Sequence, residues 1–264
     1  KNLSGKEFVK DKSSLLVILV DKSAKKNKLL IHMDKVTKGS LFKSINSFLK
    51  SKAKSLNLQS PDGVTSKEVL LMKTPEKSDT YLWLDLFKSI SKIANSLGKQ
   101  DISVMFACKC PDGKDESWLT EVCCRQIEAS AYIFGSSKNK TVVKPSLKKA
   151  SIIASSVTSS ALKKLKTSAK VGFAVGEAMN AAKHLGDMPA NLCTPRIIER
   201  KVKALKKPFP KLKISTFNEK DLAKLKMGSF LSVGRGSDEP SRMMTIEHKG
   251  GKAGEKPIVL VGKG

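Results

Sequence analysis

The sequence predicts an α/β protein in which helices flank a mostly parallel sheet. Residues 15–20, LLVILV, are continuously apolar, as is typical of a strand buried on both faces. Strand-like and helix-like segments alternate along the chain, which favours parallel strands joined by crossover helices. The chain has 264 residues, 40% of them hydrophobic, and can therefore bury a substantial core.

The next segments continue this alternation. Residues 29–33, LLIHM, follow a lysine-rich turn and predict a second strand. Residues 40–54 predict a helix, because their apolar residues recur at helical spacing. Residues 69–72 predict a third strand.

A helix over residues 81–97 is predicted from one apolar stripe and from Gly98, which supplies a stop. The stripe consists of Leu82, Leu86, Ile90, Ile93 and Leu97. A strand over 102–107 and a helix over 117–134 follow.

Residues 136–166 differ in composition, because Ser and Lys dominate them. Two short β-branched runs, at 141–143 and 151–153, suit either a last strand or edge pieces. We expect the first domain to cover residues 1–166.

A connecting helix is predicted next, within residues 167–186. Its apolar residues recur at steps of four, three, four and three, at Val171, Val175, Ala178, Ala182 and Leu185. Gly172 and Gly176 make it a thin helix that can pack closely against a neighbour.

The remaining residues, 187–264, predict the beginning of a second α/β domain. Thr194 and Pro195 give the N-cap and first residue of a helix. The predicted elements are a helix over 195–207, a strand over 212–217, a short helix over 218–226, and strands over 243–248 and 257–261. The last strand is as hydrophobic as a central parallel strand.

The net charge is +26, from 50 Lys and Arg against 24 Asp and Glu, and only five of the basic residues are Arg. Base-edge recognition relies on the planar guanidinium group, so this composition argues against sequence-specific reading of nucleic acid. Residues 129–176 hold nine Lys and no acidic residue. A solvated lysine-rich surface is the favoured interpretation, and a polyanion-binding surface stays open.

The sequence indicates a cytoplasmic protein without a membrane segment. It has no run of 18 apolar residues, and residues 1–12 are too polar for a secretory signal. The odd number of cysteines does not suit a disulfide framework. These are Cys108, Cys110, Cys123, Cys124 and Cys193. Their spacing is poor for zinc, which favours buried thiols over a metal site.

Two segments resemble phosphate-binding loops but lack residues that these motifs require. The GKG at 262–264 has Pro257 where a P-loop requires Gly, and Gly264 where it requires Ser or Thr. The loop at 234–236 begins like a dinucleotide fingerprint, but Glu239 takes the place of the third Gly. The three histidines have no nucleophile pattern around them, and structural roles are favoured.

Three segments in this order carry a family resemblance: AAKHLGDMPANLCTP (181–195), LKMGSFLSVGRGSDEPSRMMTIEHKG (225–250) and KPIVLVGKG (256–264). Together they resemble leucyl aminopeptidases (cytosol aminopeptidases), and most of all the bacterial aminopeptidase A branch. The resemblance implies a macro-domain-like first domain, a connecting helix, and the start of a catalytic domain.

The same resemblance implies a hydrolase, a hexameric metalloprotease that releases amino-terminal residues, preferably Leu, from peptides. Two divalent ions, Zn²⁺ with Mn²⁺ or Mg²⁺ at the exchangeable position, would activate water. Lys263 matches the lysine that ligates one metal in this family. A ligating amine must be neutral, so its pKa must fall far below about 10.4.

We expect no catalytic and no cofactor-binding residue within this chain, because the family supplies its other ligands further on. Asn191, Arg235, Ser237 and Glu247 lie in matching segments, but no catalytic role is assigned to them. The loop at 234–237 either lines a cleft or turns the chain. We therefore expect a truncated chain that is inactive alone. The alternatives are a DNA-binding architectural role and a noncatalytic fragment that assembles with partners.

Overall fold

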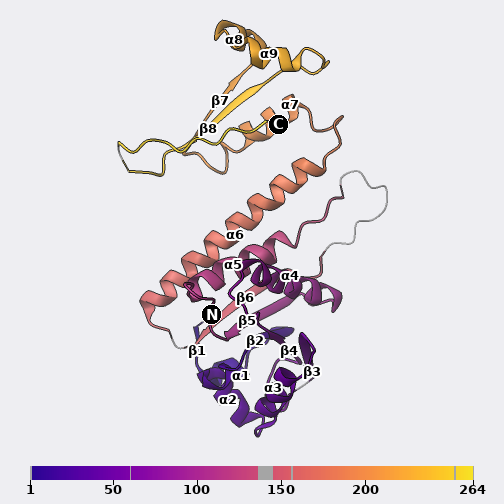
Figure 1. Ribbon diagram of the computed structural model, residues 1–264, viewed down its shortest axis with the longest axis vertical. Coiled ribbons are helices and arrows are strands. Elements are labelled where there is room, and N and C mark those ends of the chain that lie inside the picture. The colour runs from indigo at the N-terminus through magenta and orange to yellow at the C-terminus, as the bar shows by residue number, and fades with distance from the viewer. Residues whose placement is uncertain (1, 60, 136–144, 156, 253, 264) are drawn as a thin grey trace. The chain divides into compact units, whose positions relative to one another are not determined.

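The computed structural model divides the chain into two compact units, Lys1–His184 and Leu185–Gly264 (Figure 1). The structure describes residues 2–59, 61–135, 145–155, 157–252 and 254–263. Helix α6 (Ser159–Asp187) runs through both predicted domain borders, at residues 166 and 186. The predicted three-part division stays a prediction.

Unit 1 (Lys1–His184) is built on a six-stranded sheet with the strand order β1-β6-β5-β2-β4-β3. All neighbouring strands run parallel except β3 and β4. The strands are β1 (Asn2–Leu3), β2 (Leu15–Val20), β3 (Ser55–Gln59), β4 (Glu68–Lys73), β5 (Asp101–Ala107) and β6 (Lys149–Ser155). The predicted mostly parallel α/β sheet is confirmed.

Strand β2 occupies the centre of the sheet, and all six of its residues are buried. It pairs with β5 from Leu15 opposite Ile102 to Val20 opposite Ala107, and with β4 on its other side. Alternate residues enter different cores, Ile18 on one face and Val17 on the other. Because neither face meets water, the strand is apolar without alternation.

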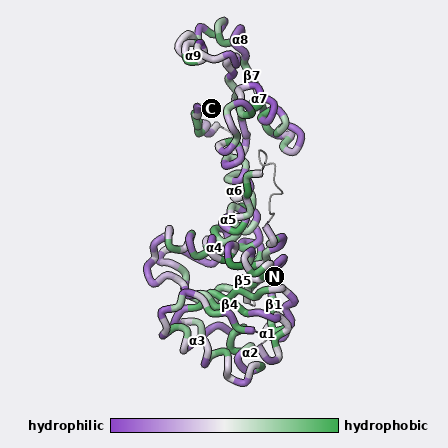
Figure 2. The backbone as a smooth tube through the Cα atoms, turned by 90° about the vertical axis from the view of Figure 1, so that its right-hand side faces the viewer, coloured by the Kyte–Doolittle hydropathy of each residue, from purple (hydrophilic) through white to green (hydrophobic). Residues whose placement is uncertain are grey.

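Helices cover both faces of this sheet (Figures 1 and 2). On one face lie α1 (Gly5–Val9), a short turn η1 (Ala24–Lys26), α2 (Lys28–Val36) and α3 (Ser40–Lys50). On the other lie α4 (Thr80–Ser96) and α5 (Glu116–Ala129). Two separate hydrophobic cores result, one for each face.

The predicted apolar stripe of α4 is not the buried one. Leu82 and Leu97 are 42% and 41% exposed. The residues that α4 buries are Trp83, Phe87, Ile90, Ser91 and Ala94. The predicted and the buried stripe share Ile90 and are otherwise offset by about one residue along the helix. The buried stripe contains Trp83 and Phe87, whose aromatic rings remove more apolar surface from water than leucine side chains do.

Residues 29–33 are helical, so the predicted strand is wrong. They lie in α2, and His32 is one of them. The side chain of Asn27 accepts hydrogen bonds from the amides of Leu29 at 3.0 Å and Leu30 at 3.2 Å and caps the helix. A run of five mostly apolar residues is too short to distinguish a strand from a helix by its periodicity. The N-cap at Asn27 is the local signal that favours the helix.

Helix α6 packs against α5 through its glycines, as predicted. A Cβ at Gly172 would lie 2.1 Å from the carbonyl oxygen of Glu121, so only glycine allows this approach. The predicted stripe lies elsewhere on α6, and Val171 and Val175 are 43% and 38% exposed. The helix therefore buries Leu165, Gly172 and Gly176 rather than the predicted apolar stripe.

Unit 2 (Leu185–Gly264) contains one antiparallel pair, β7 (Leu212–Phe217) and β8 (Met243–His248). Its helices are α7 (Pro195–Ala204), α8 (Glu219–Lys224) and α9 (Gly228–Gly234). Among its described residues only Leu222 and Ser241 are buried, at 0% and 8% exposed. No described helix in the chain is both long and apolar enough to span a membrane.

Candidate functional site

Lys263, the predicted metal ligand, is exposed and lies in a stretch without regular secondary structure. The strand predicted before it, at 257–261, is not formed. Its side chains Ile258, Leu260 and Val261 are 92%, 93% and 93% exposed. A strand requires a pairing neighbour, and none of the described strands pairs with this run.

The donor set for a metal is incomplete in the described part of the chain. No group of three or more His, Cys, Asp or Glu side chains there lies close enough together to hold an ion. A divalent metal requires several such donors. The residues present therefore do not form a dinuclear centre by themselves, and the role of Lys263 stays a prediction.

The segment 181–195 has the predicted turn between two helices. Backbone amides of Leu192 and Cys193 both donate to the carbonyl of Pro189 at 2.9 Å. The hydroxyl of Thr194 accepts from the amide of Ile197 at 3.4 Å and caps α7, with Pro at the first position. Asn191 is exposed within this turn.

The most organised polar cluster of unit 2 was not foreseen from the sequence. Arg242 donates to Glu199 at 2.9 Å, and both side chains are less than a fifth exposed. Lys203 donates to the same carboxylate at 2.6 Å from a more exposed position. Hydrogen bonds from Lys203 and then from Arg242 hold the pKa of Glu199 below its usual value. The cluster ties α7 to the residue before β8.

The loop at 234–237 turns the chain after α9. The amide of Ser237 donates to the carbonyl of Gly234 at 3.0 Å, and Arg235 and Ser237 are exposed. Glu247 lies in β8 with Lys213 3.7 Å away. These contacts belong to a turn and a strand surface, and they do not converge on a common point among the described residues.

The cysteines are free thiols, and burial raises the pKa of four of them. Cys108 and Cys110 line a cavity of about 130 Å³ beyond the carboxyl end of β5, together with Glu116. Burial raises the pKa of Cys124 to about 11. Cys123 is buried and the other three are partly buried, and thiols with raised pKa values fit packing roles better than nucleophilic ones.

Comparison with known sequences gives one consistent result. Residues 180–264 match the catalytic domain of the cytosol aminopeptidase family. A probable cytosol aminopeptidase from Aromatoleum aromaticum is 36% identical over 182 residues, which are 69% of this chain and 36% of that protein.

Solved structures share the fold at low sequence identity. A tomato leucine aminopeptidase mutant superposes with a TM-score of 0.67 at 18% identity, covering 92% of this chain and 50% of that one. The bottromycin maturation enzyme BotP in complex with Mn gives 0.63 at 16% identity, covering 89% and 45%. The chain thus spans between about a third and a half of each of these three proteins.

Proposed function

Residues 180–264 belong to the cytosol aminopeptidase family, and from that premise we propose that this chain is part of a metal-dependent aminopeptidase that releases amino-terminal residues, Leu preferentially, from peptides. The observation that carries the proposal is the match of a continuous 85-residue region to the family's catalytic domain, which includes Lys263. Mn²⁺ in one similar structure supports the use of divalent metal.

We further propose that Lys263 contributes one ligand to a pair of metal ions, Zn²⁺ with Mn²⁺ or Mg²⁺ in the exchangeable position. Bound metal would supply Lewis acidity and an activated water. Because the described residues offer no complete donor set, carboxylate ligands from elsewhere in the polypeptide would have to complete the centre. The chain as given is therefore expected to be inactive alone.

The test compares Lys263→Ala with Lys256→Ala, which replaces another exposed lysine in the same segment. Both are made in the intact source polypeptide and assayed for leucine-amide hydrolysis with added Zn²⁺ or Mn²⁺. We expect Lys263→Ala to lose more than about 100-fold in activity and to bind less metal, because even outer-shell changes cost 10–100-fold. Full activity with Lys263→Ala would overturn the ligand assignment.

A second candidate function is nonspecific DNA binding by the basic surface. Lys163, Lys166 and Lys170 are exposed on α6 at positions i, i+3 and i+7 and so share one face. Replacing all three with Gln should reduce the slope of log affinity against log salt by up to about three. Unchanged slope in a fluorescence-polarisation titration would remove this candidate.

Assembly and location complete the proposal. A homohexamer and a cytoplasmic location follow from the family resemblance. Analytical ultracentrifugation of the intact source polypeptide tests the first, and a mass near that of a single chain would contradict it. Cell fractionation tests the second.

A further inference from the structure

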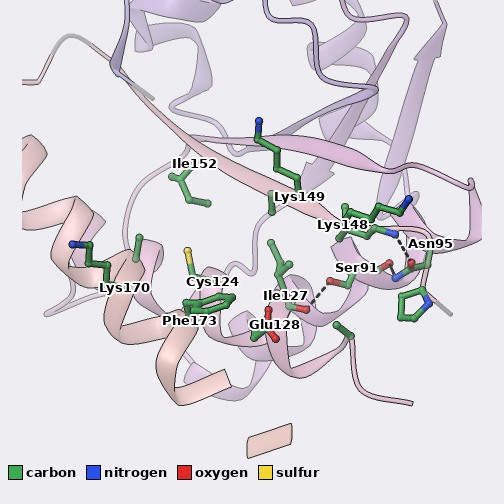
Figure 3. Close-up of a pocket in the computed structure, with 15 residues that line it drawn as sticks. Ser91, Asn95, Cys124, Ile127, Glu128, Lys148, Lys149, Ile152, Lys170 and Phe173 are labelled. Atoms are coloured by element: carbon green, nitrogen blue, oxygen red, sulfur yellow. Dashed lines mark hydrogen bonds between the residues drawn. The ribbon is translucent and has the colours of Figure 1, made fainter. Parts of the chain in front are cut away.

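Unit 1 contains a cavity of about 460 Å³ that neither the peptidase proposal nor the basic surface explains (Figure 3). Residues of α4, α5, β6 and α6 line it, together with residues 131, 145, 147 and 148 outside these elements. Small-molecule sites have volumes of about 300–1,000 Å³, so this cavity is large enough for a ligand.

The lining of the cavity is largely apolar, and Phe173, one of its apolar residues, is 49% exposed. Ile127, Ile152 and Phe173 face a common space, which the thiol of Cys124 also borders (Figure 3). The polar side chain of Asn95 has both ends occupied. It donates to the carbonyl of Ser91 at 2.9 Å and accepts from the amide of Leu147 at 3.0 Å.

Three lysines lie on the exposed side of the cavity. Lys148, Lys149 and Lys170 line the cavity, and all three are exposed. The amines of Lys149 and Lys170 point away from the apolar space (Figure 3). Glu128 is the single acidic residue among the described lining residues, and burial, then the nearby Glu177, raise its pKa.

We propose that this cavity binds a free medium-chain aliphatic carboxylate. The hydrocarbon chain lies among Ile127, Ile152 and Phe173, and the carboxylate lies at the lysine-lined opening. The apolar interior excludes a multiply charged anion, because its charges would be buried without partners. The ammonium groups at the opening favour an anionic head over an uncharged one.

The first experiment titrates the 264-residue chain with hexanoate, octanoate and decanoate by isothermal calorimetry. Each added methylene that is buried should tighten Kd by about threefold to fourfold, until the cavity is full. 1-Octanol is the uncharged match to octanoate and should bind more weakly. Absence of octanoate binding, or equal Kd values for octanoate and octanol, would overturn the proposal. So would binding of an apolar dipeptide where octanoate fails.

The second experiment uses variants of the lining. Ala169→Phe fills the cavity and should abolish octanoate binding, while an unchanged circular-dichroism spectrum shows that the chain folds. Lys149→Gln with Lys170→Gln should weaken octanoate binding about tenfold or more and leave octanol binding unchanged. Lys163→Gln, an exposed lysine of α6 outside the lining, is the control. Octanoate binding that persists in Ala169→Phe would place the ligand elsewhere.

Discussion

Glu68 shows how single residues gain their roles from partners distant in sequence. Its carboxylate accepts hydrogen bonds from Lys99, which follows α4, and from Asn57 of β3 at 3.0 Å. These hydrogen bonds, that from Lys99 first, lower the pKa of Glu68. Nothing in the local sequence singles out this pair, because its geometry requires the folded sheet.

The lowered pKa makes the contribution of Glu68 to stability dependent on pH. Since the folded pKa lies below the unfolded value of about 4.3, the contribution is fully present above pH 4.3 and is lost as pH falls through the folded pKa. Glu68→Gln should therefore be less stable than the wild type at pH 7 and nearly equal to it at low pH. Urea unfolding at both pH values measures the difference in unfolding free energy between the two proteins. A difference that grows as the pH falls would contradict the prediction.

The candidate site residues could be predicted only where a local sequence motif marks them. Thr194 and Pro195 were recognised because a cap acts through its immediate neighbours. Arg242 and Glu199 are 43 residues apart, and their contact follows from the pairing of β7 with β8. Lys263 was singled out by resemblance alone, and its surroundings could not be predicted because no local pattern specifies them.

At the level of elements, the most reliable predictions were those with strong local signals. The strands at 212–217 and 243–248 were predicted with the observed bounds. The elements β1, α1, β3 and α9 were missed, because they are short and lack a clear apolar period. The helix predicted over 117–134 ends at Ala129. The run at 151–153 lies in β6, and that at 141–143 lies outside the described residues.

The contact between α5 and α6 gives a prediction about packing. In Gly172→Ala the new Cβ would meet the backbone of Glu121, which cannot move without shifting α5. We expect a loss of about 1–3 kcal/mol in unfolding free energy. Gly186→Ala lies in the same helix with nothing within 4 Å, and should be neutral or stabilise by up to about 1 kcal/mol. Equal changes in stability for the two variants in thermal unfolding would contradict close packing of α6 against α5.

The link between α7 and β8 gives a second prediction at this scale. Arg242→Gln should destabilise unit 2 by about 1.5–3 kcal/mol, because a largely buried, charge-assisted hydrogen bond to Glu199 is lost. Lys203→Gln removes a more exposed partner of the same carboxylate and should cost under about 1 kcal/mol. Hydrogen exchange at the amides of β8 reports both. A larger loss of stability in Lys203→Gln than in Arg242→Gln would contradict this prediction.

For the whole molecule, composition and alternation predicted the class of the fold but not its strand order. The continuous apolarity of β2 indicates a central strand. It does not indicate which strands lie beside it, because every parallel neighbour offers similar apolar side chains. The run at 257–261 carries the same signal yet pairs with no described strand.

The two units should differ in stability. Unit 1 has two hydrophobic cores, whereas the described part of unit 2 buries only Leu222 and Ser241. Both tryptophans, Trp83 and Trp118, lie in unit 1. In a urea titration, far-UV circular dichroism should therefore show a loss of structure before tryptophan fluorescence changes. Coincident transitions would show that the units unfold together.

The order of strands in unit 1 also constrains how the chain acquires its fold during synthesis. Strand β2 is synthesised before both of its partners, β4 and β5, and β5 begins only at Asp101. Strand β1 pairs with β6, where Leu3 lies opposite Ser155. Such distant pairings are slow to form, because long loops must close first. Until β5 is synthesised, one edge of the fully buried strand β2 stays unpaired, so the nascent chain should depend on chaperones during that interval.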